Sequence, residues 1–231
     1  MIKWLEDAVF YEVYPQSFRD SNGDGIGDIP GITEKLEYIQ ELGCNALWIN
    51  PCFTSPFYDA GYDVEDYYSV APRYGTNEDL KKLFEAAHQR GMHVLLDLVP
   101  GHTAVTHPWF QESMKAEKNE YTDRYVWTDS LYKRMEDVKG IVSVLRGISP
   151  RPASCGVNCF STQPALNYGF ANITDAGWQQ PTDAPGPMAT REELKNIMRF
   201  WLTLGCDGFR VDMAGSLVKN DEDKKETIRL W

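Results

Sequence analysis

The sequence predicts an α/β fold built on a parallel sheet, and two kinds of observation support this. Three times a helical pattern ends at a glycine and a strand pattern follows directly, at residues 42–47, 90–94 and 204–209. Residues 94–99 are apolar on both faces except at Asp97, which is typical of a strand buried in a parallel sheet. Repeated helix-to-strand units imply a parallel sheet. They do not by themselves separate a closed barrel from an open, doubly wound sheet.

The amino-acid composition and net charge limit the kinds of molecule that the protein is expected to bind. The 231 residues are 42% hydrophobic and 25% charged, with a net charge of −11 and a sequence pI near 4.8. This suits a globular domain with a core, and its acidity argues against a nucleic-acid or anionic-membrane partner. No apolar stretch approaches the ~20 residues of a membrane span, and the first residues lack the apolar core of a secretory signal.

The number of cysteines indicates the redox state of the cellular compartment in which the protein is found. Their number is five, and the odd count indicates a reduced, cytoplasmic protein. The alternative at Cys155 and Cys159 is a disulfide or a metal site.

The first strand is expected at residues 9–15, where Pro15 ends it. An oxygen-rich loop follows, threaded with glycines, and its polar side chains are Asp20, Asn22, Asp24 and Asp28. Oxygen ligands at this spacing can surround Ca²⁺, but an EF-hand would need a glutamate where Gly31 stands. The alternative is a loop of Asx-turns without a metal.

The next elements repeat the helix-to-strand pattern. A helix over 33–42 precedes a strand over 46–50, and a loop rich in Tyr and Asp follows at 53–67. A capping box of Thr76 and Asp79 predicts a helix that ends at Gly91. The buried third strand is then expected at 94–99.

From residue 103 to about 190 the apolar runs are short, and Pro, Gly and polar residues are frequent. Such a stretch is too long for one loop of a compact domain, which indicates an inserted, irregular subdomain. Thr190 and Glu193 have capping-box spacing, and helical periodicity follows as far as Gly205. The predicted organisation is a first part over 1–102, the insertion over 103–189, and a continuation over 190–231.

The stretch before the C-terminus carries the first candidate for chemistry. Phe209, Val211 and Met213 alternate with polar residues, which predicts a fourth strand with Arg210 and Asp212 on one face. A nearby cation lowers the pKa of a carboxyl group and keeps it ionised, as a nucleophile requires. The alternative is an ordinary ion pair at a strand end.

Three motifs resemble those of the alpha-amylase family (glycoside hydrolase family 13), with matching order and spacing: GFRVD at 208–212, DLVPGH at 97–102 and QPALN at 163–167. The opening YEVYPQSFRDSNGDGIGDIPGI resembles the family's oligo-1,6-glucosidase and trehalose-synthase branch. Two positions depart from the pattern, since Gly101 stands where Asn is usual and Ala165 where an acidic residue is usual. The resemblance implies the N-terminal half of a (β/α)8 barrel with an irregular subdomain inserted after the third strand.

The resemblance also implies roles for the candidate residues. Asp212 would be the nucleophile of a retaining glycosidase that acts on alpha-glucosidic bonds in oligosaccharides, with Arg210 holding it. Asp59 and Tyr62 would hold the terminal sugar, His102 would bind it in the first subsite, and Asp97 would be structural. The calcium ligands of this branch would be Asp20, Asn22, Asp24, the Ile26 carbonyl and Asp28. A second metal site is not carried over, because Gly101 has no side chain.

The resemblance further implies an incomplete site. Retaining glycosidases need a second carboxyl group about 5 Å from the nucleophile, and in the family a later strand supplies it. No such segment lies between Asp212 and Trp231, and Glu222 and Glu226 lie in a charged, helix-like stretch that is usually solvated. We therefore expect the isolated chain to be inactive.

A half-barrel would also expose two sheet edges and an apolar inner face. Self-association, or pairing with a complementing C-terminal half, is therefore expected. The alternative function is a catalytically inactive half-barrel that binds carbohydrate or assembles with another chain. The sequence does not separate alpha-1,4 from alpha-1,6 preference, or hydrolysis from isomerisation.

Overall fold

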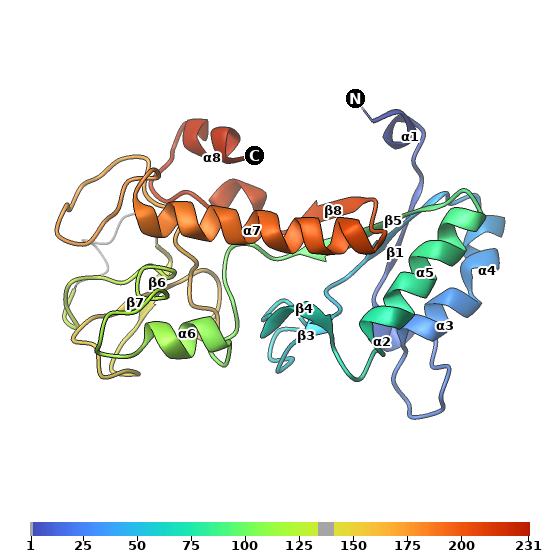
Figure 1. Ribbon diagram of the computed structural model, residues 1–231, viewed down its shortest axis with the longest axis horizontal. Coiled ribbons are helices and arrows are strands. Elements are labelled where there is room, and N and C mark those ends of the chain that lie inside the picture. The colour runs from blue at the N-terminus through green and yellow to red at the C-terminus, as the bar shows by residue number, and fades with distance from the viewer. Residues whose placement is uncertain (1, 134–140) are drawn as a thin grey trace. The chain divides into compact units, whose positions relative to one another are not determined.

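The computed structural model describes residues 2–133 and 141–231 (Figure 1). These residues form two compact units. The first, called here the sheet unit, runs to Thr54 and includes Asp66–Leu98 and Ile197–Val211. The second, called the loop unit, comprises Ser55–Glu65, Val99–Asn196 and Asp212–Trp231. The loop unit contains the stretch predicted as an insertion and takes in two further segments, while the predicted boundaries at 102 and 189 stay a prediction.

The sheet unit is built on four parallel strands among the described residues, as predicted. Their order in the sheet is β1-β2-β5-β8, with β1 at Phe10–Val13, β2 at Ala46–Ile49, β5 at His93–Leu98 and β8 at Gly208–Val211. In β5, Val94, Leu96 and Leu98 are fully buried, and Asp97 is only 1% exposed. The buried strand expected from its apolar faces is therefore confirmed.

The sheet unit also contains the helices α1 (Lys3–Glu6), α2 (Pro15–Phe18), α3 (Ile29–Glu34), α4 (Leu36–Glu41) and α5 (Asn77–Gln89). Figure 1 shows α3, α4 and α5 side by side. The capping box at the start of α5 is present, because Asp79 N donates to Thr76 Oγ1 and Thr76 N donates to Asp79 Oδ2. The apolar face of α5, with Leu80, Leu83, Phe84 and Ala87, is fully buried.

The single helix predicted over 33–42 is wrong. Two short helices replace it, and they meet at Lys35, whose φ of −107° and ψ of 9° break the helical run. The first of them begins at Ile29 because Asp28 Oδ1 accepts a hydrogen bond from Gly31 N, at 2.7 Å, and Pro30 suits the first turn. The sequence pattern predicts Asp28 as part of the metal loop and does not reveal this cap, so the predicted helix start is too late.

The helix predicted from Thr190 also begins earlier, and its predicted capping box is wrong. Helix α7 runs over Pro185–Leu204, and the proline suits its start. Thr190 lies one turn inside, where its Oγ1 donates to Gly186 O at 3.1 Å. Near its C-terminal end Trp201 is fully buried, and its Nε1 donates to Tyr67 O at 2.8 Å.

The predicted loop over 53–67 carries strand residues at both ends. Strand β3 (Phe53–Thr54) pairs antiparallel with β4 (Asp66–Val70). Phe53 stacks on Trp201 with ring centroids 5.1 Å apart. This packing holds the two ends of the loop in the sheet unit.

Besides residues 185–196 of α7, the described part of the loop unit contains only short regular elements: α6 (Pro108–Ser113), β6 (Ser143–Leu145), β7 (Cys155–Val157), η2 (Ala214–Ser216) and α8 (Lys225–Leu230). Isolated bridges tie its chain together, among them His102 with Ala165 and Tyr125 with Leu166. Ala165 is fully buried, which explains a small apolar side chain at this position of QPALN.

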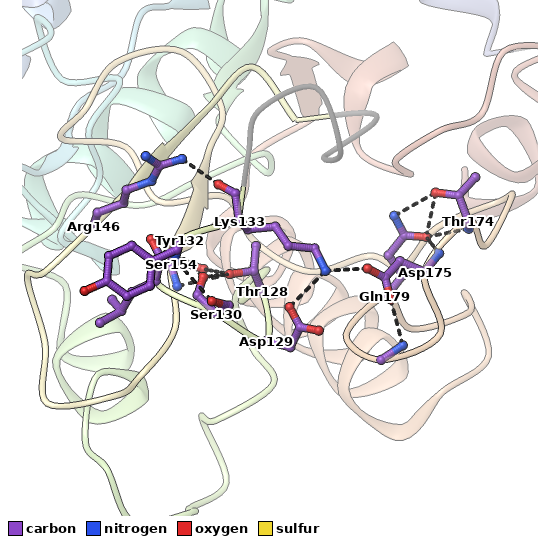
Figure 2. Close-up of polar contacts among 12 residues, drawn as sticks. Thr128, Asp129, Ser130, Tyr132, Lys133, Arg146, Ser154, Thr174, Asp175 and Gln179 are labelled. Carbon is purple, nitrogen blue, oxygen red and sulfur yellow. Dashed lines mark hydrogen bonds and ion pairs between the residues drawn. The ribbon is translucent and has the colours of Figure 1, made fainter.

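A polar network holds three segments of the loop unit together (Figure 2). Lys133 Nζ forms ion pairs with Asp129 and Asp175, and Arg146 Nη2 donates to Lys133 O. The hydrogen bonds that Lys133 donates to the two carboxylates raise its pKa, the one to Asp175 most. These side-chain contacts, rather than strand pairing, link Lys133 to Arg146 and Asp175.

Two features near the C-terminus differ from expectation. Met213 was predicted to continue the fourth strand, but β8 ends at Val211 and Met213 has a φ of +46°. Asp221 directly precedes Glu222 in the charged stretch predicted to be solvated, but it is 6% exposed and lies outside α8. Its carboxylate accepts a hydrogen bond from Thr227 N at 2.8 Å, so it is a buried anchor for the helix.

Candidate active site

Arg210 lies on β8 opposite Asp97 on β5, and the two side chains form an ion pair. Arg210 Nη1 is 3.0 Å and 3.1 Å from the two carboxylate oxygens of Asp97. Trp48 Nε1 also donates to Asp97, at 3.0 Å, and the guanidinium lies over the Trp48 ring. Asp97 is thus the structural residue that the resemblance implied, and the role of Arg210 toward Asp212 stays a prediction.

The loop unit holds the other candidate residues. Asp212 begins its last segment, directly before the left-handed residue Met213. A non-glycine residue in this conformation is uncommon and marks a backbone that the surrounding structure constrains. Such constraint is frequent where a side chain must be held for chemistry.

The segment 55–65 carries Asp59 and Tyr62, and the buried carboxylate of Asp63 organises it. Asp63 accepts hydrogen bonds from Ser55 Oγ at 3.0 Å, Tyr58 N at 2.8 Å and Asp59 N at 3.1 Å. Phe57 and Ala60 have positive φ, as a tightly folded loop requires. The loop is therefore an ordered platform, contrary to the solvated loop that its composition alone would favour.

Asp59 connects this platform to the QPALN motif. Gln163 Nε2 donates to Asp59 Oδ2 at 2.6 Å, and Tyr62 N donates to Asp59 O at 2.8 Å. Burial raises the pKa of Asp59, and the charges of Asp63 and Asp212 raise it further, while the bond from Gln163 lowers it. Because the charge of Asp212 acts on Asp59, the predicted nucleophile lies near the residue predicted to bind the sugar.

His102 is 2% exposed and uses both ring nitrogens. Its Nε2 lies 2.9 Å from Tyr62 O, and its Nδ1 lies 3.1 Å from Asn158 Nδ2. Burial lowers the pKa of His102 to about 4, so the ring is neutral at pH 7. The structure therefore brings His102 close to the loop that carries Tyr62 and Asp59, while their roles in sugar binding stay a prediction.

A pair of sulfur atoms lies beside these residues. Cys159 Sγ is 3.3 Å from Met213 Sδ, and burial raises the pKa of the Cys159 thiol, with the charge of Asp212 raising it further. Cys155 is fully buried, and both cysteines are free. Neither the disulfide nor the metal site considered for this pair is present among the described residues.

The predicted calcium loop lies in the sheet unit and consists of nested Asx-turns. Asp20 accepts hydrogen bonds from Asn22, Gly23 and Gly25 N, and these bonds lower its pKa, that from Gly25 most. Asn22 accepts from Asp24 N, and Asp24 accepts from Ile26 N. The five predicted ligands, Asp20, Asn22, Asp24, the Ile26 carbonyl and Asp28, lie within this one loop.

The donor chemistry of this loop fits a hard cation, because every predicted ligand atom is oxygen. In the described part of the chain no three His, Cys, Asp or Glu side chains converge as a metal cluster, and Asp28 also caps α3. The Asx-turns are present in the structure, and calcium binding at the loop stays a prediction.

Four neighbours of the site had no assigned role in the sequence analysis: Asp63, Asn158, Gln163 and Lys219. Gln163 belongs to QPALN, so its motif was a signal. Asp63 was one of several acids in an aromatic loop, and nothing in the sequence distinguished it. Asn158 lies 56 residues from His102, and Lys219 lies 61 from Asn158, so no local pattern links them.

Fold and site together define part of a parallel (β/α)-barrel domain. A family model described as the alpha-amylase catalytic domain matches residues 12–229. The chain belongs to the alpha-amylase family.

Named relatives agree with this membership. The chain is 38% identical over 219 residues to an oligo-1,6-glucosidase from a Bacillus species, covering 95% of this chain and 40% of the relative. It is 41% identical over 231 residues to a trehalose synthase/amylase from Mycolicibacterium smegmatis, covering 97% and 36%. The crystal structure of trehalulose synthase from Pseudomonas mesoacidophila superposes with a TM-score of 0.79 at 38% identity, covering 94% of this chain and 36% of that one.

The chain therefore spans between 36% and 40% of the length of these relatives. Within its described residues no helix is both long and apolar enough to cross a membrane.

Proposed function

We propose that the chain is the N-terminal part of the catalytic domain of an enzyme that cleaves or transfers alpha-glucosidic bonds in oligosaccharides with retention of configuration. Similar proteins are named oligo-1,6-glucosidase, trehalose synthase and alpha-glucosidase. Similar trehalulose synthase structures hold sucrose or glucose. All these ligands are glucose or contain an alpha-glucosyl unit, which is the substrate class proposed here.

The observation that carries the proposal is the convergence in the loop unit. Asp59 and Tyr62 come from one loop, His102 from the segment after β5, and Asp212 from the segment after β8. Catalytic residues of barrel enzymes lie after the carboxyl ends of different strands. The arrangement follows that rule, and it gathers a carboxylate nucleophile with hydrogen-bonding and aromatic groups suited to a sugar.

In the proposed reaction, an Asp212 oxygen attacks the anomeric carbon as the bond to the leaving oxygen breaks. A second carboxyl group gives its proton to that oxygen, and the glucosyl group stays bound to Asp212 as an ester. Water or another sugar hydroxyl then displaces Asp212 after losing its proton to the second group. In the family pattern this second group is a glutamate from a later strand, outside the region that the chain covers.

Calcium at the loop of Asp20, Asn22, Asp24, Ile26 and Asp28 is proposed as structural and takes no part in the reaction. The cytoplasmic location also stays a prediction. The five free cysteines support it without deciding it.

The test is hydrolysis of 4-nitrophenyl alpha-glucoside by the purified chain, beside the variants Asp212→Asn and Asp223→Asn. Asp223 is an exposed aspartate that serves as the matched control. Turnover that vanishes only in Asp212→Asn supports the proposal and implies a proton donor supplied by a second copy or a nearby group. Maltose binding without turnover supports a catalytic part that needs a complementing segment.

A chain that neither turns over the substrate nor binds maltose contradicts the proposed function. The remaining candidate is then the non-catalytic alternative, a half-barrel that assembles with another chain.

A further inference from the structure

The loop unit contains one buried lysine whose role the proposed reaction does not explain. Lys219 is 5% exposed, and its Nζ donates to Ser216 O at 3.0 Å and contacts Asn158 Oδ1 at 3.4 Å. Within the described residues it has no carboxylate partner. Burial lowers the pKa of Lys219 to about 8, which leaves the ammonium mostly charged at pH 7. A buried cation is costly, so its place beside the candidate site calls for a reason.

The ammonium decides which way the Asn158 amide points. A protonated lysine can only donate, so the amide atom facing it must be the oxygen Oδ1. The amide nitrogen then points the other way, where Asn158 Nδ2 lies 3.1 Å from His102 Nδ1. Asparagine oxygen and nitrogen differ little in shape, and the Lys219 charge is the strongest of the contacts that make the two orientations unequal, while Met213 Sδ, 3.9 Å from Asn158 Nδ2, favours the same one.

The oriented amide and the Tyr62 carbonyl together determine which ring nitrogen of His102 carries the proton. Because Asn158 Nδ2 donates, His102 Nδ1 must accept, and the single proton of the neutral ring lies on Nε2. That nitrogen lies 2.9 Å from Tyr62 O, within donating distance. The Nε2–H bond therefore fastens the backbone of the loop that carries Asp59 and Tyr62.

The space for Asn158 depends on Gly101. A Cβ at residue 101 would lie 2.6 Å from Asn158 Nδ2 and 3.4 Å from its Cγ. The first distance is too short for any real contact, so a larger residue at 101 would displace the amide. Gly101 is one of the two departures from the family motif, and here it provides the volume that Asn158 occupies.

We propose that Lys219 is a positioning residue that acts through Asn158. It orients the amide so that His102 Nδ1 accepts, which leaves the proton on Nε2 for Tyr62 O and so helps to hold the Asp59–Tyr62 loop in place. The consequence for sugar binding rests on the proposed function, whereas the tautomer does not. The four residues Lys219, Asn158, His102 and Gly101 are called the relay below.

The test is long-range ¹H–¹⁵N correlation NMR on the full chain with ¹⁵N-labelled histidine, which distinguishes protonated from unprotonated ring nitrogens. Only four histidines are present, and His102 is assigned by loss of its signals in His102→Gln. The wild-type chain is expected to show His102 at pH 7 with Nε2 protonated and Nδ1 unprotonated. A protonated Nδ1 in the wild-type chain overturns the proposal.

Three variants sharpen the result. Lys219→Met is expected to give a mixture of His102 tautomers, because the amide can then flip and its oxygen at Nδ1 competes with Tyr62 O at Nε2 for the ring proton. Asn158→Asp keeps a partner for Lys219, so it is expected to fold, and its carboxylate should draw the proton to Nδ1. Lys224→Met, which removes an exposed lysine nearby, is expected to leave the wild-type pattern unchanged.

Failure of Asn158→Asp to protonate Nδ1 at pH 7 overturns the relay, as does a folded Lys219→Met variant with the wild-type pattern. Maltose affinity is expected to fall about tenfold in Lys219→Met, the effect of one lost hydrogen bond. Absence of maltose binding in the wild-type chain removes the proposed function alone. The tautomer measurement then still decides the relay.

Discussion

Arg210 and Asp97 form an ion pair across two neighbouring parallel strands, with Arg210 Nη1 at 3.0 and 3.1 Å from the Asp97 oxygens. The Asp97 side chain has no solvent exposure, whereas that of Arg210 is 35% exposed. The buried carboxylate therefore depends on the guanidinium and on Trp48 Nε1 for its solvation.

Removal of this guanidinium should destabilise the chain strongly. We expect Arg210→Met to lower the free energy of unfolding by about 3 kcal/mol, because it leaves a buried carboxylate without its counter-charge. Lys81→Met, which breaks an exposed pair with Glu85, should cost under about 1 kcal/mol. Urea denaturation of both variants measures the difference, and equal losses would contradict the structural role of the pair.

Asp207 should make stability depend on pH in the acid range. Its carboxylate accepts hydrogen bonds from His88 Nε2, His93 Nδ1 and Val94 N. Burial acts to raise its pKa, but these hydrogen bonds outweigh burial and lower the pKa from its usual 3.8. A carboxyl group with a lowered pKa in the folded state stabilises the fold above its unfolded pKa, and this contribution is lost as pH falls through the folded value.

The variant Asp207→Asn should therefore be less stable than the wild-type chain by ~2 kcal/mol at pH 7. The difference should stay level down to about pH 5 and shrink below pH 4, as the wild-type carboxylate is protonated. Urea midpoints recorded at intervals from pH 7 to pH 3 test this. A difference that grows toward low pH is the opposite sign and would reject the assignment.

The loop of Asp20 to Asp28 should bind calcium if the family resemblance extends to it. Calcium at 100 times its dissociation constant should then stabilise the chain by about 2.7 kcal/mol. Asp24→Ala should remove calorimetric binding with little loss of stability in the absence of metal, because Asp24 accepts one hydrogen bond within the exposed loop.

Asp28 provides the contrast. Asp28→Ala should cost about 1 kcal/mol even without calcium, because that residue caps α3, and more with calcium, because it is also a predicted ligand. A wild-type chain that shows no heat of calcium binding would identify the loop as Asx-turns alone.

The sheet edges should drive association of the isolated chain. Among the described strands, β1 and β8 each pair with only one neighbour, and Phe10 on β1 is 39% exposed. Sedimentation velocity should show a dimer or larger assembly, and Phe10→Lys should shift it toward monomer because a charged edge disfavours strand pairing. Tyr132→Lys changes a residue that is 87% exposed in the loop unit and should leave the assembly unchanged. A well-folded wild-type monomer would refute this prediction.

Local signals predicted much of the fold because they report on neighbours in sequence. The capping box at Thr76 and Asp79 starts α5, and the apolar run over 94–99 is the buried strand β5. Local sequence patterns gave wrong helix boundaries where two patterns overlap. Asp28 has the spacing of a metal ligand, although it also caps α3. The spacing of Thr190 and Glu193 is that of a capping box, although α7 already begins at Pro185.

The sequence by itself determined the family, the parallel strands and the identities of Asp212, Asp59, Tyr62 and His102 as candidates, because short motifs carry these features. Only the tertiary structure decided which side chains meet. It paired Arg210 with Asp97, made Asp63 the anchor of the Asp59 loop, and placed Lys219 and Asn158 behind His102. These partners lie on different segments, and their contacts depend on how the whole chain packs, which no local pattern encodes.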